Sequence, residues 1–218
     1  MTDQVVPVST DLRPQNITVS SRLVPVSIHV MSKCPDAIAC ESVLNDVLEQ
    51  VGEVVDFTVD YITTSSSTPS KPKCMHGPEE CEGNKQQLCF AKEYPHWHSW
   101  YKFILCQNRH WTALPSRSLA ETCAHQAGGQ YEGWMEECVH GPEGKVLLAA
   151  SAARSKSLGI QRSCTIQISR KTRCIRDGGV WKDCPGGGEV SDFVRDICAT
   201  YQGANPPKAC VHHHSRHQ

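Results

Sequence analysis

Cys34 is the residue of this chain whose type and place in the sequence best suit chemistry. It stands between a predicted strand at 24–31 and a predicted helix, with Pro35 suited to the first helical turn. The free N–H groups at a helix N-terminus stabilise a thiolate, and a thiolate attacks disulfides to form a mixed disulfide. Cys34 is therefore a candidate nucleophile for thiol–disulfide exchange.

A nucleophilic thiol of this kind usually has a second, resolving thiol, and the next cysteine is Cys40. Six residues of regular helix separate two positions by about 9 Å along the axis, whereas a disulfide needs Cα atoms about 4.4–6.8 Å apart. Pairing of Cys34 with Cys40 would require the helix to begin near Ala37, with Asp36 as an acceptable N-cap. Three arrangements stay open: a fixed Cys34–Cys40 bridge, a redox pair in which Cys40 resolves, or separate partners.

The elements that must position Cys34 follow from hydrophobic periodicity. Apolar residues alternate along 24–31 and again along 55–61, which predicts two strands. Between them, apolar residues recur at helical spacing and the pattern stops at Gly52, which predicts a helix. A strand–helix–strand order favours two parallel strands joined by a right-handed crossover.

The remainder of the chain is divided by its composition. Residues 74–140 are rich in cysteine and tryptophan without strand alternation, which indicates short helices held by disulfides. A helix follows from Pro142 to about residue 157, and a hairpin of two strands occupies 164–175. Ser191 is expected to cap the last helix.

The two ends of the chain are predicted to lack regular structure. Residues 1–22 are polar and aperiodic, which indicates a flexible arm, and 203–218 is expected to be a disordered tail. The folded part therefore runs from 24 to 202 and is of the α/β class, with a disulfide-rich helical insertion at about 74–140.

A second motif fixes cysteines and polar residues at set offsets between 74 and 89. Its fixed positions are Cys74, His76, Gly77, Glu80, Cys81, Asn84 and Cys89. This run resembles the signature of the gamma-interferon-inducible lysosomal thiol reductase (GILT) family, and it differs at Met75, where the family usually has Gln. The resemblance, which extends over roughly 24–202, implies a thioredoxin-like fold and reduction of protein disulfides, with small thiols as reductant and no cofactor.

Two departures from that family's pattern concern the redox site. A Cys-x-x-Cys pair would need a cysteine at 37, where the chain has Ala37. Thioredoxin-like enzymes also place a cis-proline before the third strand, and Ser163-Cys164 stands at that place here. The resemblance thus implies that Cys164 lies near Cys34, as an alternative resolving thiol or as a partner that locks Cys34.

The other cysteines are interpreted as structural. The signature run does not have the two close pairs of a usual zinc finger, so we expect disulfides that pin the helical insertion and no metal. Cysteines at family-like places or in an elaboration that resembles fungal relatives are further disulfide candidates. They are Cys106, Cys123, Cys138, Cys174, Cys184 and Cys198.

The composition of the chain limits which cellular compartment and which binding partners are expected. Thirteen cysteines in 218 residues indicate an oxidising compartment, and the odd number leaves at least one outside an intramolecular disulfide. The net charge of −1 gives no indication of nucleic acid or an acidic membrane surface as partner. No stretch is long and apolar enough to span a bilayer or to serve as a signal peptide, so we expect a missing leader. Asn16 begins an N-glycosylation sequon, which fits export.

Two hypotheses for function remain from the sequence. The first is a thiol oxidoreductase of the secretory pathway, extracellular or lysosomal/vacuolar, that acts on disulfide-containing or unfolded polypeptides. The second is a secreted, disulfide-stabilised binding protein that keeps the scaffold without turnover, which the absence of Cys-x-x-Cys and of the proline motivates.

Overall fold

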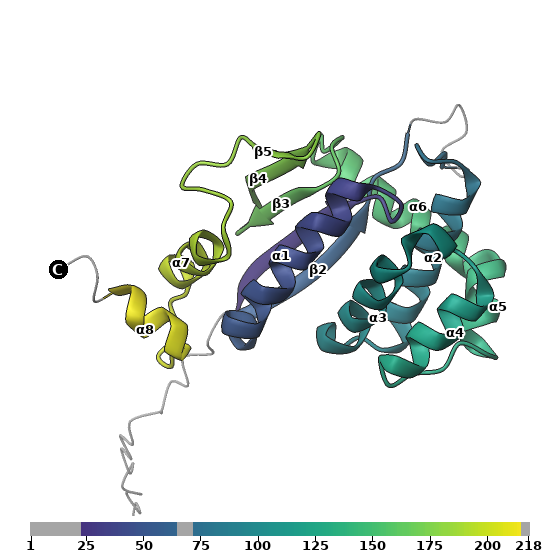
Figure 1. The fold of residues 1–218 in the computed structure, drawn as a ribbon, viewed down its shortest axis with the longest axis horizontal. Coiled ribbons are helices and arrows are strands. Elements are labelled where there is room, and N and C mark those ends of the chain that lie inside the picture. The colour runs from purple at the N-terminus through teal and green to yellow at the C-terminus, as the bar shows by residue number, and fades with distance from the viewer. Residues whose placement is uncertain (1–22, 65–71, 215–218) are drawn as a thin grey trace, which may run out of the picture.

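A mixed five-stranded sheet forms the centre of the protein, with strand order β2-β1-β3-β4-β5 (Figure 1). The computed structural model describes residues 23–64 and 72–214; the expected arm at 1–22 and its sequon at Asn16 lie outside this part. The strands are β1 (Val24–Val30), β2 (Val55–Tyr61), β3 (Thr165–Ile168), β4 (Lys171–Asp177) and β5 (Val180–Lys182). Only β1 and β2 pair in parallel, and the other neighbours are antiparallel.

The β1–α1–β2 unit has the order that the periodicity predicts. Helix α1 (Pro35–Val51) begins directly after Cys34 and ends at Gly52, where a 3-10 turn (Gly52–Val54) leads into β2. Its apolar stripe, which includes Leu44, Val47 and Leu48, is fully buried against the sheet. Because this stripe is buried, the N-terminus of α1 is held near the C-terminal end of β1.

The helical insertion lies between β2 and α6 and occupies one side of the sheet (Figure 1). Its helices are α2 (Pro78–Glu93), α3 (Trp97–Arg109), α4 (Arg117–Gln126) and α5 (Trp134–His140), with a 3-10 turn at Trp111–Ala113. The ring of Phe57 on β2 stacks on Trp100 at 5.2 Å and meets Tyr101 edge-on at 4.9 Å. This aromatic contact joins the insertion to the central sheet.

Helix α6 (Pro142–Ser157) packs against β2 and α2. Serines on α6 satisfy polar groups of the sheet: Ser151 Oγ accepts from the Tyr61 N–H at 2.8 Å, and Ser155 Oγ lies 2.9 Å from His29 Nδ1. Burial lowers the pKa of His29 below its ordinary value. Burial thus favours the neutral imidazole, whose contact with Ser155 serves the packing of α6 on β1.

The C-terminal part differs from the sequence-based expectation in three respects. Strand β5 was not predicted, and α7 (Val190–Thr200) is capped by Glu189 rather than Ser191, through a capping box with Asp192. Within the tail expected to be disordered from 203 to 218, Lys208–His214 instead form the short helix α8, and 215–218 lie outside the described residues. The disulfide Cys198–Cys210 ties α8 to α7, which explains why this polar segment is ordered.

Candidate functional site

Cys34 is the N-cap residue of α1 and carries a free, half-buried thiol. All thirteen cysteines lie in the described part of the chain, and the other twelve form six disulfides. The thiol donates to the Ser163 carbonyl at 3.7 Å, and the Cys34 N–H donates to the Met31 carbonyl at 2.9 Å. The sulfur therefore lies at a helix N-terminus, where unpaired backbone N–H groups favour an anion.

Helix α2 holds the two residues that precede Cys34. The Ser32 N–H donates to Asn84 Oδ1 at 3.1 Å, and its hydroxyl donates to the Glu80 carbonyl at 3.2 Å. The ammonium of Lys33 pairs with Glu79 at 2.9 Å and also donates to the Leu114 carbonyl. We call the contacts of Ser32 and Lys33 with α2 the α2 anchor. It fixes the turn from which the Cys34 thiol projects.

The signature run supplies the α2 anchor and builds its own support. Gly77 is the N-cap of α2 at φ +88°, a conformation that side-chain-bearing residues rarely adopt. His76 Nδ1 pairs with the buried Glu80 carboxylate one helical turn on. Asn84, also fully buried, lies within 3.7 Å of the Cys74 sulfur. The Glu80 backbone carbonyl and the Asn84 side chain also reach the Cys34 turn.

Gly83 lets α2 approach the Cys34 turn closely. A Cβ atom at this position would lie 2.8 Å from the Ser32 hydroxyl and 2.8 Å from the Leu114 side chain. A Cβ atom does not approach non-bonded atoms this closely, so a larger residue would push the helix away from Ser32. Gly83 was not among the residues singled out from the sequence.

Cys40 pairs with Cys164 and not with Cys34. Of the three arrangements left open by the sequence, the structure shows the one with separate partners, and α1 does not begin late, since Pro35 is already helical. It also shows that Cys164 does not lock Cys34. Both sulfurs of this disulfide belong to fully buried residues, and Cys164 follows Ser163, whose carbonyl contacts the Cys34 thiol. The free thiol thus lies beside a sealed disulfide.

Asp36, in the first turn of α1, links the site to the β4–β5 hairpin. Its carboxylate accepts from the N–H groups of Gly178 and Gly179 at 2.8 and 2.9 Å and lies 3.6 Å from the Arg176 guanidinium. These donors balance the negative charge of Asp36 near the thiol. Both glycines have positive φ, which brings two successive N–H groups onto one carboxylate.

The remaining cysteines are joined within or between neighbouring elements. Cys74 pairs with Cys81 at the start of α2, so the first two cysteines of the signature bind each other. The other pairs are Cys89–Cys138, Cys106–Cys123, Cys174–Cys184 and Cys198–Cys210. Cys210 is the partner that sequence reasoning missed; the odd cysteine count and a cysteine in the tail were the available signal.

The fold and the free thiol define a thioredoxin-like protein, and solved structures agree. The reduced disulfide bond oxidoreductase DsbG of Mycobacterium tuberculosis aligns with a TM-score of 0.58 and 13% identity, covering 96% of this chain and 92% of its own. Oxidised DsbA of the same organism aligns with a TM-score of 0.57 and 14% identity, covering 96% and 97%. At such identities the likeness concerns the fold, and it confirms the thioredoxin-like expectation.

Sequence comparison identifies the family. The profile described as gamma interferon inducible lysosomal thiol reductase (GILT) matches residues 25–127, which include Cys34 and the whole signature run. The chain carries a divergent GILT-family domain.

Two curated relatives are consistent with this assignment. A gamma-interferon-responsive lysosomal thiol protein of Arabidopsis thaliana is 23% identical over 200 residues, covering 86% of this chain and 75% of the relative. GILT-like protein 1 of Drosophila melanogaster is 28% identical over 149 residues, covering 59% of this chain and 58% of the relative.

Proposed function

We propose that the protein is a thiol oxidoreductase that reduces disulfides of polypeptides, with Cys34 as its nucleophile. The observation that carries this proposal is the half-buried free thiol at the N-terminus of α1. Membership of a family of thiol reductases supports the same chemistry. No cofactor is required, because electrons move between sulfur atoms alone.

The first step is attack of the Cys34 thiolate on one sulfur of a substrate disulfide. A bond forms between Cys34 Sγ and that sulfur, the substrate S–S bond breaks, and its electron pair leaves on the second sulfur as a thiolate that takes a proton from water. The partial positive charge at the N-terminus of α1 favours the attacking anion. The α2 anchor keeps the sulfur in place during the attack.

A small thiol completes the cycle in this proposal. Position 37 is alanine, and Cys40 and Cys164 are bound to each other, so neither is available as a resolving thiol in this state. One small thiolate attacks the Cys34 sulfur of the mixed disulfide and releases the reduced substrate. A second attacks the sulfur of the bound small thiol, frees Cys34 and leaves as a small disulfide. Two thiols are oxidised for each disulfide reduced. Resolution by Cys40 or Cys164 would first require their disulfide to open.

The compartment proposed is the secretory pathway, with an extracellular, lysosomal or vacuolar destination. Six disulfides persist in an oxidising environment and are rare in the cytosol. Within the part of the chain that the structure describes, no helix is long and apolar enough to cross a bilayer. Glycosylation at Asn16 stays a prediction, which a mobility shift on glycosidase treatment of the secreted protein would test.

The test compares the purified protein with its Cys34→Ser variant in dithiothreitol-driven reduction of a protein disulfide. We expect the variant to lose the catalysed rate entirely, and a double Cys40→Ala, Cys164→Ala variant to retain catalysis, since neither residue resolves in the proposed cycle. Mass spectrometry should find one alkylated cysteine, Cys34, in the untreated protein. Equal rates for the protein and Cys34→Ser would remove catalysis and favour the second hypothesis, a binding protein on the same scaffold, which the alanine at 37 motivates.

A further inference from the structure

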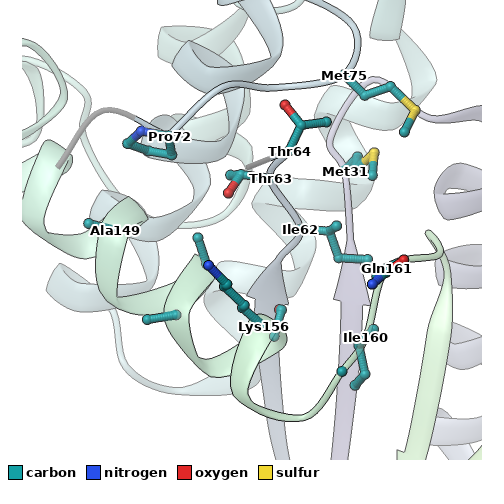
Figure 2. Close-up of a pocket in the computed structure, with 14 residues that line it drawn as sticks. Met31, Ile62, Thr63, Thr64, Pro72, Met75, Ala149, Lys156, Ile160 and Gln161 are labelled. Carbon is teal, nitrogen blue, oxygen red and sulfur yellow. The ribbon is translucent and has the colours of Figure 1, made fainter. Parts of the chain in front are cut away.

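A groove of about 580 Å³ opens beside the reactive thiol, between the end of β2, the loop after α6 and the turn before α2 (Figure 2). Its volume lies in the range of ordinary ligand sites, about 300–1,000 Å³. Cys34 packs against the small buried cluster of Met31, Ile62 and Ile160, and all three members of this cluster line the groove. A chain that lies in the groove therefore contacts the same cluster that Cys34 packs against.

The walls of the groove are mainly apolar. Ala149, Ala152 and Ala153 face it from α6, and their small side chains leave the space that larger residues would fill. Met31 and Met75 lie on the opposite side, as Figure 2 shows, with Lys156 on the α6 side. Methionine side chains adapt to differently shaped apolar partners, which suits a surface that receives many sequences.

Met75 has a specific relation to this groove. It is 60% exposed although it is a large apolar residue, and it stands in the signature run at the position where Gln is usual in the family. The difference replaces an amide by a thioether on the groove wall. When a ligand covers an exposed apolar side chain, the free energy of the complex falls, because apolar surface is removed from water.

We propose that this groove binds apolar side chains that flank a cysteine in the substrate polypeptide, and that Met75 is a specificity-determining residue of this chain. The inference rests on the proposed function, because attack by Cys34 is what requires the substrate cysteine to lie at the end of the groove. Small polar disulfides such as glutathione disulfide present little apolar surface for these walls. A polypeptide with leucine or valine beside its disulfide fits them.

The experiment uses two synthetic peptides with the same disulfide, one flanked by leucine and valine and the other by serine and asparagine. We expect kcat/KM for dithiothreitol-driven reduction to be about tenfold higher for the apolar peptide, since covering one large apolar side chain corresponds to at least that ratio. Met75→Gln should reduce this ratio about threefold. Ala153→Glu, which places a carboxylate on the wall, should remove it. Leu23→Gln, an exposed apolar residue at the opposite end of β1 from Cys34, is the matched control and should leave both rates unchanged.

A binding measurement separates failure of the groove from failure of the proposed function. The apolar peptide, with serine in place of its cysteines and a fluorescent label, is titrated with Cys34→Ser protein and followed by anisotropy. If the peptide binds, Ala153→Glu abolishes this binding, and the unmodified protein shows no turnover, the groove proposal is supported and the proposed enzymatic activity is overturned. Turnover with equal kcat/KM for the two peptides would overturn the groove and keep the enzyme. If neither binding nor turnover is observed, the groove proposal and the proposed enzymatic activity are both overturned.

Discussion

Substitution of Asn84 by alanine tests whether the α2 anchor serves the thiol or only the fold. Asn84 Oδ1 accepts the buried N–H of Ser32, two residues before Cys34. Alanine would leave this N–H without a partner, at a cost of about 1–3 kcal/mol in the free energy of unfolding. If the geometry of the turn also governs attack, a comparable loss in the transition state lowers kcat/KM about tenfold, because 1.36 kcal/mol corresponds to a factor of ten.

The matched control is Gln87→Ala, also a buried residue of α2. Gln87 accepts from the Tyr61 hydroxyl and donates to Gln107 at 3.0 Å, and neither contact involves the Cys34 turn. We expect this variant to lose stability to a similar extent in urea denaturation while its alkylation rate at Cys34 and its kcat/KM stay unchanged. Full Cys34 reactivity in both variants, or a loss in both that follows stability, would refute a role of the α2 anchor in the attack.

Three further predictions concern stability and the protein's own disulfides. Burial raises the pKa of Glu41 from 4.5 to about 7, so between these values the folded state keeps a proton that the unfolded state releases. The free energy of unfolding should therefore fall by up to about 3 kcal/mol as pH rises through this window. Glu41→Gln should abolish that slope in urea denaturation from pH 4.5 to about pH 8; an unchanged slope would contradict the assignment. Gly83→Ala should cost about 1–3 kcal/mol through overpacking against Ser32, and an unaltered midpoint of thermal unfolding would argue against this close approach. Under native conditions dithiothreitol should open the half-buried Cys74–Cys81 disulfide before the fully buried disulfides. Timed alkylation followed by mass spectrometry would show the order of opening. Simultaneous opening of these disulfides would mean that exposure does not control the order.

The sequence predicted the part of the fold that rests on local periodicity. Alternation along 24–31 and 55–61, and the apolar stripe that ends at Gly52, gave the β1–α1–β2 unit and therefore the position of Cys34 at the N-terminus of α1. Local patterns of this kind depend on neighbours in the chain, so they can be recognised without tertiary information.

The parts that the sequence missed depend on contacts distant in the chain. Cys40 and Cys164 are 124 residues apart, and the place of Cys164 beside α1 follows from the packing of β3 against β1. Strand β5 has only three residues between glycine turns, too few to show alternation. Helix α8 has little apolar periodicity and is held by a disulfide to Cys198, a constraint that spacing alone does not reveal.

The half-buried Cys74–Cys81 disulfide sets an upper limit on useful reducing conditions. The small thiols that regenerate Cys34 in the proposed cycle also attack this bond, and it secures the start of the helix that holds Ser32. We expect activity to rise with reductant at first and to decline once that bond opens. The proposed cycle is therefore suited to surroundings that supply electrons sparingly, because an abundant supply would open the disulfide at the start of the helix that holds the Cys34 turn.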